Sequence, residues 1–207
     1  MPRPRSLTHA DIVGAALAVL DRDGLAKLSM RAVAAELGTS AMALYRYVAD
    51  RGQLEERIVE HLLSAVDLTL PAGASWKEQV AALMERVRAV IAAHPAAVTL
   101  LLTHRHRSPA SLRWIDTMLR VLVDAGLTGT ERAIAQRSLV GYLLGSLHTQ
   151  HLGPLSGPGT KAMAALPVGE YPHLTETAEQ ARHITPDEEF RRGLAIFLRG
   201  LETTPSS

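Results

Sequence analysis

The feature that most limits what this chain can fold into is residues 28–54, which read LSMRAVAAELGTSAMALYRYVADRGQL. Ser29 is a good N-cap for a short helix over 30–37, and Gly38 supplies the left-handed residue that often follows a helix. A second capped helix is predicted over 41–48. A helix this short is not stable alone and must pack against its neighbours. Two short helices joined by a glycine turn have the spacing of a helix-turn-helix motif.

Composition excludes several other classes of protein. With 207 residues, 47% of them apolar, the chain can bury a core of ordinary size. It has no cysteine, which excludes disulfide frameworks and thiolate zinc sites. No stretch reaches the roughly 18 apolar residues of a membrane span, and the first residues lack the apolar segment of a signal peptide. We therefore expect a cytoplasmic protein with no membrane partner.

Helical signals extend along the rest of the chain. Thr8 and Asp11 have capping-box spacing ahead of a first helix, which should end at 21–24. Asp50 can cap a fourth helix that we expect to continue until 70–73. Further helices are predicted at 75–93, after 94–95, at 109–126, from 128 or 130 to 152, and from 185 to the last apolar positions near 201. The Gly- and Pro-rich segment 153–172 is expected to be irregular.

No strand alternation or internal repeat interrupts this pattern. The predicted fold class is therefore all-α, with an N-terminal three-helix head that contains the helix-turn-helix motif. A larger helical body follows. We place the head at residues 7–64 and the body at residues 65–207.

The head resembles the tetracycline-repressor-like (TetR) family of transcriptional regulators. The resemblance rests on an AxxLG turn ending at Gly38, the run LYRYV over 44–48, and Arg51 followed by Leu54 at the start of the next helix. It covers about the first 60 residues. It implies a DNA-binding head and a body that dimerises and senses a small-molecule effector, without identifying that molecule.

The resemblance and the chemistry of the side chains together predict the DNA contacts. An Arg fork suits guanine or phosphate, hydroxyls at a helix start can hold phosphate, and small or apolar groups can meet thymine methyls. Apolar residues at positions where family members often carry polar ones shift sequence specificity toward Arg side chains and DNA shape. The predicted DNA-binding residues are Arg31, Thr39, Ser40, Met42, Ala43, Tyr45, Arg46, Tyr47 and Arg51.

Each assignment has a simpler alternative. Arg31 could be a solvated surface charge, and Thr39 or Ser40 could be plain N-caps. Tyr45 and Tyr47 cannot share a helix face, so one of them could belong to the core, although we favour a surface position for both. Outside the motif, Arg3 and Arg5 form a basic arm that could contact DNA or be a disordered tail.

A dimer is expected on physical grounds. Around the motif four basic residues face two acidic ones, a local excess of two, so a single head would bind weakly. Two heads on one body read two half-sites, and symmetry then predicts a palindromic operator on double-stranded DNA. The predicted homodimer surface is Gly141, Leu144, Gly145, Phe190, Leu194, Phe197 and Leu198. Intramolecular core packing is the alternative for these residues.

An effector site would be a cavity in the body, lined mainly by aliphatic side chains because aromatics are only 4% of the chain. The candidate lining residues are Trp76, Met84, Trp114 and Met118, each of which could equally be core. The polar candidates are His94, Thr103, His104, His106, His148, Thr149 and His151. The pairs His104/His106 and His148/His151 have no carboxylate partners close by in sequence, so no metal and no cofactor is predicted.

Nothing in the sequence indicates an enzyme, since it contains no phosphate loop, nucleophile elbow or paired-carboxylate motif. The predicted function is a DNA-binding regulator, in particular a homodimeric repressor released from its operator by a small molecule. One alternative is a ligand-independent DNA-binding or adaptor protein that acts through a protein partner. A histidine–metal enzyme on a helical scaffold is a third possibility.

Overall fold

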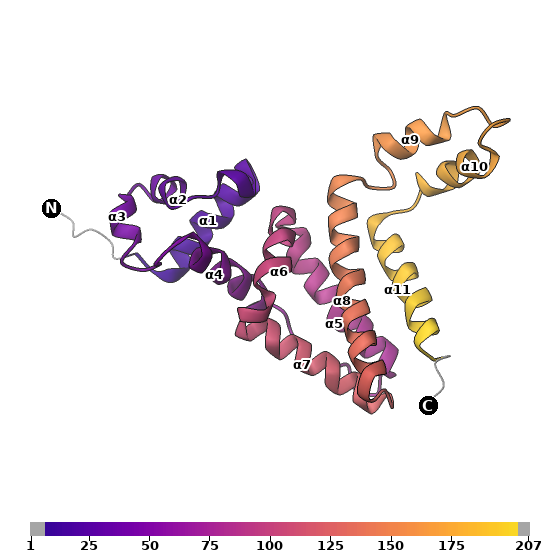
Figure 1. Cartoon of the computed structure of the whole chain (residues 1–207), viewed down its shortest axis with the longest axis horizontal. Helices are drawn as coiled ribbons and strands as arrows, with labels where there is room; N and C mark the ends of the chain where they lie inside the picture. The colour runs from indigo at the N-terminus through magenta and orange to yellow at the C-terminus, as the bar shows by residue number, and fades with distance from the viewer. Residues whose placement is uncertain (1–6, 203–207) are drawn as a thin grey trace. The chain divides into compact units, whose positions relative to one another are not determined.

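The structure is a computed structural model that describes residues 7–202, with the side chains of residues 7–201. Over that range the chain forms eleven α-helices and three 3-10 helices and no strand (Figure 1). The prediction of an all-α fold with a helix-turn-helix head is confirmed. Arg3 and Arg5, the predicted basic arm, lie outside the described residues.

The head helices begin where their N-caps predict. They are α1 (His9–Asp23), η1 (Leu25–Lys27), α2 (Met30–Glu36), α3 (Ala41–Leu44) and α4 (Arg51–Ser64). The side chains that accept a hydrogen bond from the first turn of α1, α2, α3 and α4 are Thr8, Ser29, Ser40 and Asp50. Gly38 has a φ of 64°, the left-handed conformation expected between α2 and α3.

Two predicted helix ends are wrong. The second helix of the motif ends at Leu44 rather than at Val48, because Arg46 and Tyr47 donate their backbone N–H groups to residues three positions back, which tightens the turn. Helix α4 ends at Ser64, well before Leu70.

The chain after α4 is fixed by bonds that compete with helix formation. The carboxylate of Asp67 accepts the N–H of Thr69 at 2.9 Å, and Arg86 donates to the backbone carbonyls of both residues. Hydrogen bonds from the backbone and side chain of Thr69 lower the pKa of the Asp67 carboxyl, and the charge of Arg86 adds to this effect. A short polar turn therefore replaces the predicted last turns of the helix.

One apolar core holds the head helices together. Its members come from all four α-helices and are fully or almost fully buried: Ile12, Ala16, Val19, Leu20, Val33, Leu44, Leu54 and Ile58. Burial of each large aliphatic side chain contributes about 1.5–3 kcal/mol, so packing rather than helix propensity stabilises these short helices.

The remaining helices complete two compact units of the chain. Of the residues that the structure describes, one unit contains 7–70 and 85–118, and the other contains 71–84 and 119–202. The helices after the head are α5 (Trp76–Ala92), η2 (Pro95–Ala97), α6 (Val98–His104), η3 (Arg105–Arg107), α7 (Pro109–Asp124), α8 (Gly129–Leu152), α9 (Pro158–Ala164), α10 (Pro172–Ala181) and α11 (Pro186–Glu202).

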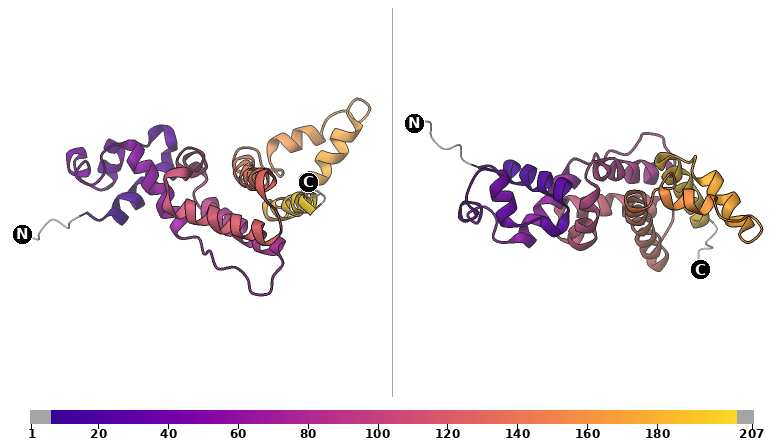
Figure 2. Two further views of the ribbon diagram at one scale, coloured as in Figure 1. Left: turned by 60° about the horizontal axis from the view of Figure 1, so that its bottom comes forward. Right: turned by 90° about the horizontal axis from the view of Figure 1, so that it is seen from above.

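Within the second unit, α8 and α11 lie side by side, while α9 and α10 pack on each other and extend away from them (Figure 2). The prediction of an irregular segment over 153–172 is wrong, because α9 forms inside it, and α10 was not predicted. Both helices begin with proline at the first helical position, a start signal that the surrounding Gly and Pro residues obscure.

Candidate DNA-binding site

Helix α3 and the turn that follows it, residues 45–48, have a buried side and an exposed side. Leu44 and Val48 are 0% and 1% exposed and attach this segment to the head core. On the other side Met42 is 76% exposed, Tyr45 is 48% exposed, and Arg46 also faces solvent. A large apolar side chain as exposed as Met42 has no role in the head core, so this surface is available to a partner.

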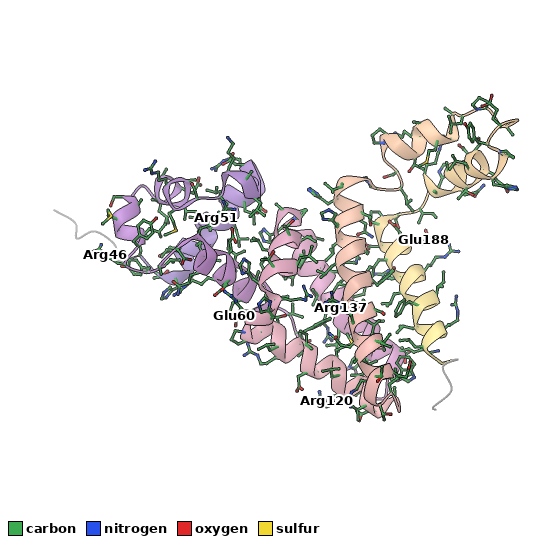
Figure 3. All side chains as sticks on the ribbon, viewed as in Figure 1. Arg46, Arg51, Glu60, Arg120, Arg137 and Glu188 are labelled. Carbon is green, nitrogen blue, oxygen red and sulfur yellow. The ribbon has the colours of Figure 1, made fainter. Side chains whose placement is uncertain are left out.

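Two arginines of the head have no carboxylate partner among the described residues and are available to bind another molecule. Arg31 in the first turn of α2 and Arg46 after α3 are both exposed. Arg46 is labelled in Figure 3. Within residues 7–201, neither guanidinium is paired with a carboxylate. Each can therefore present its planar fork of donors to a base edge or a phosphate.

Arg51, by contrast, is already engaged. Its Nε donates to Oε1 of Glu55 at 2.7 Å, and Nη2 donates to the backbone carbonyl of Leu25 at 3.1 Å. The side chain is 45% exposed. Two of the five N–H donors of a guanidinium are used in this way, so three remain for another partner.

The other predicted contacts differ in their surroundings. Tyr45 is exposed, whereas Tyr47 is partly buried and meets the ring of His9 edge-on, with centroids 6.3 Å apart. Neither tyrosine belongs to the fully buried core. Ser40 accepts the N–H of Ala43 at 3.2 Å and therefore acts as an N-cap, while Thr39 and Ala43 are partly buried.

Residues on α4 that sequence reasoning missed connect the head to the chain after it. Glu60 accepts the hydroxyl of Ser108 at 2.6 Å and the backbone N–H of Ala110 at 2.9 Å, both at the start of α7. Partial burial raises the pKa of Glu60, but these hydrogen bonds, one from Ser64 and the charge of Arg113 outweigh it and leave the pKa below its usual value.

Two further carboxylates on α4 bind the segment 104–107. Oε2 of Glu55 lies 2.9 Å from Nε2 of His104, and Oε1 of Glu56 lies 2.7 Å from Nη1 of Arg107. The only sequence signal for these pairs is a helix rich in Glu and a later run of basic residues. Because the partners are about fifty positions apart, local pattern cannot pair them.

The predicted effector residues have different environments. Met84, Trp114 and Met118 are buried, and Trp76 is partly buried. His148, Thr149 and His151 are exposed on α8, and the Thr149 hydroxyl donates to the backbone carbonyl of Gly145. His104 is buried against Glu55. Among residues 7–201 no group of three His, Asp or Glu side chains is arranged to hold a metal.

The predicted dimer residues also divide into two groups. Phe190, Leu194, Leu198 and Leu144 are buried within the single chain, which is the intramolecular packing that the sequence left open. Gly141 and Gly145 are exposed on α8, and Phe197 is partly buried. Two isoleucines that sequence reasoning did not single out are also exposed, Ile134 on α8 at 54% and Ile196 on α11 at 63%.

Two further features of the described chain bear on a site. An open cleft of about 240 Å³ lies between α1 and α4, lined by His9, Ala10, Val13, Arg57, Glu60 and His61. In residues 7–202 no single helix is long and apolar enough to cross a membrane. The pair Trp76–Ala92 and Pro95–Arg107 reaches the required length and composition only together, across a bend of 114°.

Comparison with known proteins identifies this arrangement. Residues 12–57 match the model of bacterial regulatory proteins of the tetR family, and residues 70–204 match the tetracyclin repressor-like C-terminal domain. The chain belongs to the TetR family. It is therefore a transcriptional regulator with the DNA-binding head of that family, as the sequence predicted.

Individual TetR-family proteins are similar over most of this chain. The HTH-type transcriptional repressor DrrR1 of Streptomyces coeruleorubidus is 29% identical over 216 residues, which cover 97% of this chain and 79% of DrrR1. An HTH-type transcriptional regulator of Saccharopolyspora erythraea is 31% identical over 144 residues, 70% of this chain and 61% of that regulator, so the match spans under two thirds of its length.

A solved structure extends the similarity to the fold. The crystal structure of the Streptomyces coelicolor TetR family protein ActR in complex with (S)-DNPA has a TM-score of 0.81 and 26% identity to this chain. The alignment covers 96% of this chain and 98% of ActR. The helical body as well as the head is thus similar to that of a ligand-binding regulator.

Proposed function

We propose that this TetR-family protein is a homodimeric repressor that binds a palindromic DNA operator and releases it when a small molecule binds the body. Residues 7–64 would contact DNA, and residues 65–207 would dimerise and bind the effector. The observation that carries the proposal is the exposed surface of α3. There Met42, Tyr45 and Arg46 face solvent while Leu44 and Val48 fix the helix to the head core.

The chemistry of that surface fits the major groove. An α-helix fits the width of the groove, an Arg fork pairs bidentately with guanine, and an apolar side chain can contact the methyl group of thymine. Arg46 and Met42 supply these two groups. Arg31, Arg51 and the tyrosine hydroxyls would hold phosphates on either side and so fix the register of the helix on DNA.

A homodimer would place two such heads on one operator. The exposed Gly141 and Gly145 lie four residues apart on α8, so a helix of a second chain can approach this face closely. Ile134 and Ile196 add exposed apolar surface on α8 and α11. Core residues such as Phe190 and Leu194 would act indirectly, by fixing α11 to α8 within each chain.

The repressor and effector parts of the proposal are supported by relatives. DrrR1 is a transcriptional repressor, and ActR binds (S)-DNPA. An effector releases DNA only if it binds the DNA-free arrangement of the two heads more tightly than the DNA-bound one. We propose that the protein acts in the cytoplasm, where a DNA-binding regulator of this family finds its operator, and that it is not an enzyme.

The first test is Arg46→Ala. Its binding is measured by fluorescence anisotropy against an operator selected from random duplex DNA and against a scrambled duplex of the same length. If Arg46 reads a base, the operator should lose about 1–3 kcal/mol of binding free energy while the scrambled duplex changes little. Arg120→Ala on α7 is the matched control, since this exposed arginine lies outside the head (Figure 3). Equal losses for Arg46→Ala on both duplexes would reassign Arg46 to phosphate, and no loss on either would contradict the proposed surface.

A further inference from the structure

Glu55 lies between a predicted DNA-contacting residue and a histidine from α6. One carboxylate oxygen accepts a hydrogen bond from Arg51 Nε at 2.7 Å, and the other lies 2.9 Å from Nε2 of His104. The side chains of Glu55 and His104 are only 14% and 10% exposed, whereas that of Arg51 is 45% exposed. The hydrogen-bonded series His104–Glu55–Arg51 therefore runs from the interior of the unit that contains the head to its surface.

The same carboxylate serves Arg51 and His104, so its hold on Arg51 depends on the charge of His104. An Arg that is paired with a carboxylate has less charge to offer to a phosphate, because the carboxylate and the phosphate compete for it. Histidine is the side chain whose charge ordinarily changes between about pH 5 and 8. A proton on His104 would strengthen its pair with Glu55, so the Glu55 carboxylate would compete less with a phosphate for Arg51.

The groups around His104 make this effect local. Of the elements packed on α6, α4 presents Glu55 and also Glu56, whose Oε1 lies 3.9 Å from Nδ1 of His104. Helix η3 contributes Arg107, which is paired with Glu56, and also Arg105, which donates to the backbone carbonyl of Leu102, and the exposed His106. Helix η2 has no titratable side chain. Arg51 and Arg107 balance the two glutamates, so the cluster has a net charge of zero with neutral His104 and +1 with protonated His104.

We propose that Glu55 and His104 are positioning residues that set how much of the Arg51 charge reaches DNA, so that operator binding strengthens as His104 gains a proton. This inference rests on the proposed DNA-binding function and adds a pH-dependent control of one phosphate contact. Because linkage is reciprocal, operator binding draws a proton onto His104. Where His104 is neutral in the free protein, operator binding is therefore accompanied by proton uptake.

The test compares wild type with His104→Gln, which keeps a hydrogen-bond donor toward Glu55 but cannot become charged. Operator affinity is measured by anisotropy at pH 8 and pH 6 in one salt concentration, and proton uptake is measured by calorimetry in buffers of different ionisation heat. The wild-type affinity should rise with acidification by about fivefold more than that of His104→Gln. His106→Gln is the matched control, because His106 is exposed on η3 and should leave both readouts at the wild-type level.

Glu55→Gln provides a second, independent variant in case His104→Gln does not fold, which circular dichroism would reveal. It removes the competing charge, so it should bind the operator more tightly at pH 8 and gain less on acidification. The slope of log binding constant against log salt concentration should become steeper by about 0.9 for each additional phosphate that Arg51 reaches.

Three outcomes would overturn the proposal. His104→Gln could retain the full wild-type pH response and proton uptake, or Glu55→Gln could bind no more tightly at pH 8 and respond to pH like wild type. If wild type binds no selected sequence at any pH, the proposed function itself fails, and the role assigned to Glu55 and His104 fails with it. The wild-type measurement thus distinguishes the two failures.

Discussion

The head and the α9–α10 pair are both built from short helices, but only the head buries a core. Helix α1 alone has seven buried residues, whereas α9 and α10 have one each, Thr160 and Ala178. Exposed apolar side chains are also numerous around the pair, including Val168 and Tyr171. Base recognition needs side chains held in place by a packed support, and the head provides one. A segment with few buried contacts opens locally at low cost, so the pair should be the more dynamic region.

Truncation of an apolar side chain should give the largest difference in stability loss between the head and the α9–α10 pair. Leu54 on α4 is fully buried, so Leu54→Ala should lower the free energy of unfolding by about 2–5 kcal/mol through lost burial and a cavity. Leu174 on α10 is 39% exposed, and Leu174→Ala should cost less than about 1 kcal/mol. Urea unfolding followed by circular dichroism measures both. Similar losses for the two variants would show that the pair has a core comparable to that of the head.

Glu60→Gln should have the next largest effect and lower the free energy of unfolding by about 1–3 kcal/mol. It weakens the hydrogen bonds that attach α4 to the start of α7. Glu179→Gln on α10 is the control, since that carboxylate is exposed and, among the residues that the structure describes, bonds only to Arg182.

The effect of Glu60 should also depend on pH in a defined direction. Its folded-state pKa is lowered from 4.5, so its carboxylate stabilises the fold above that pH, and this stability is lost as the pH falls through the folded-state pKa. Thermal unfolding at pH 7 and pH 3 should show a smaller acid-induced loss for Glu60→Gln than for wild type. An unchanged loss would mean that Glu60 contributes nothing to acid unfolding.

The smallest effect expected is that of a helix cap. Thr8 forms a capping box with Asp11 at the start of α1, so Thr8→Ala should cost about 1 kcal/mol. Thr177→Ala on α10 removes the same hydroxyl from an exposed position inside a helix and should be neutral or slightly stabilising. Thermal unfolding of the two variants measures the difference, and equal effects would show that the capping box adds no stability to the head.

The same contrast explains what the sequence could predict of the fold. Helix starts in the head were predictable because hydroxyl or carboxylate caps and Gly38 determine them within a few residues. The end of α4 depends on Arg86, nineteen positions from Asp67, and could not be read locally. In 153–172, Gly and Pro residues obscured α9, whose first residue, Pro158, is itself a start signal.

The candidate site follows the same rule. The exposure of Met42 and the burial of Leu44 follow from helical periodicity in α3, and Arg46 lies four positions after Met42 in the turn that follows the helix. Arg51 and Glu55 are four positions apart on α4, a spacing that sequence shows, whereas the engagement of Glu55 by His104 joins segments 49 positions apart and became visible only in three dimensions. The exposed side chains of the candidate site are thus easier to predict from sequence than the distant side chains that engage them.

The measurement that tests the central claim most directly is selection of bound sequences from random duplex DNA by the purified protein at a fixed, stated salt concentration. Salt must be fixed because phosphate contacts make affinity depend on it. We expect a palindromic sequence with two half-sites about one helical turn apart, or a multiple of that distance, bound by a dimer. Recovery of no motif, with only salt-sensitive binding to all sequences, would contradict the assignment of this head to a specific operator.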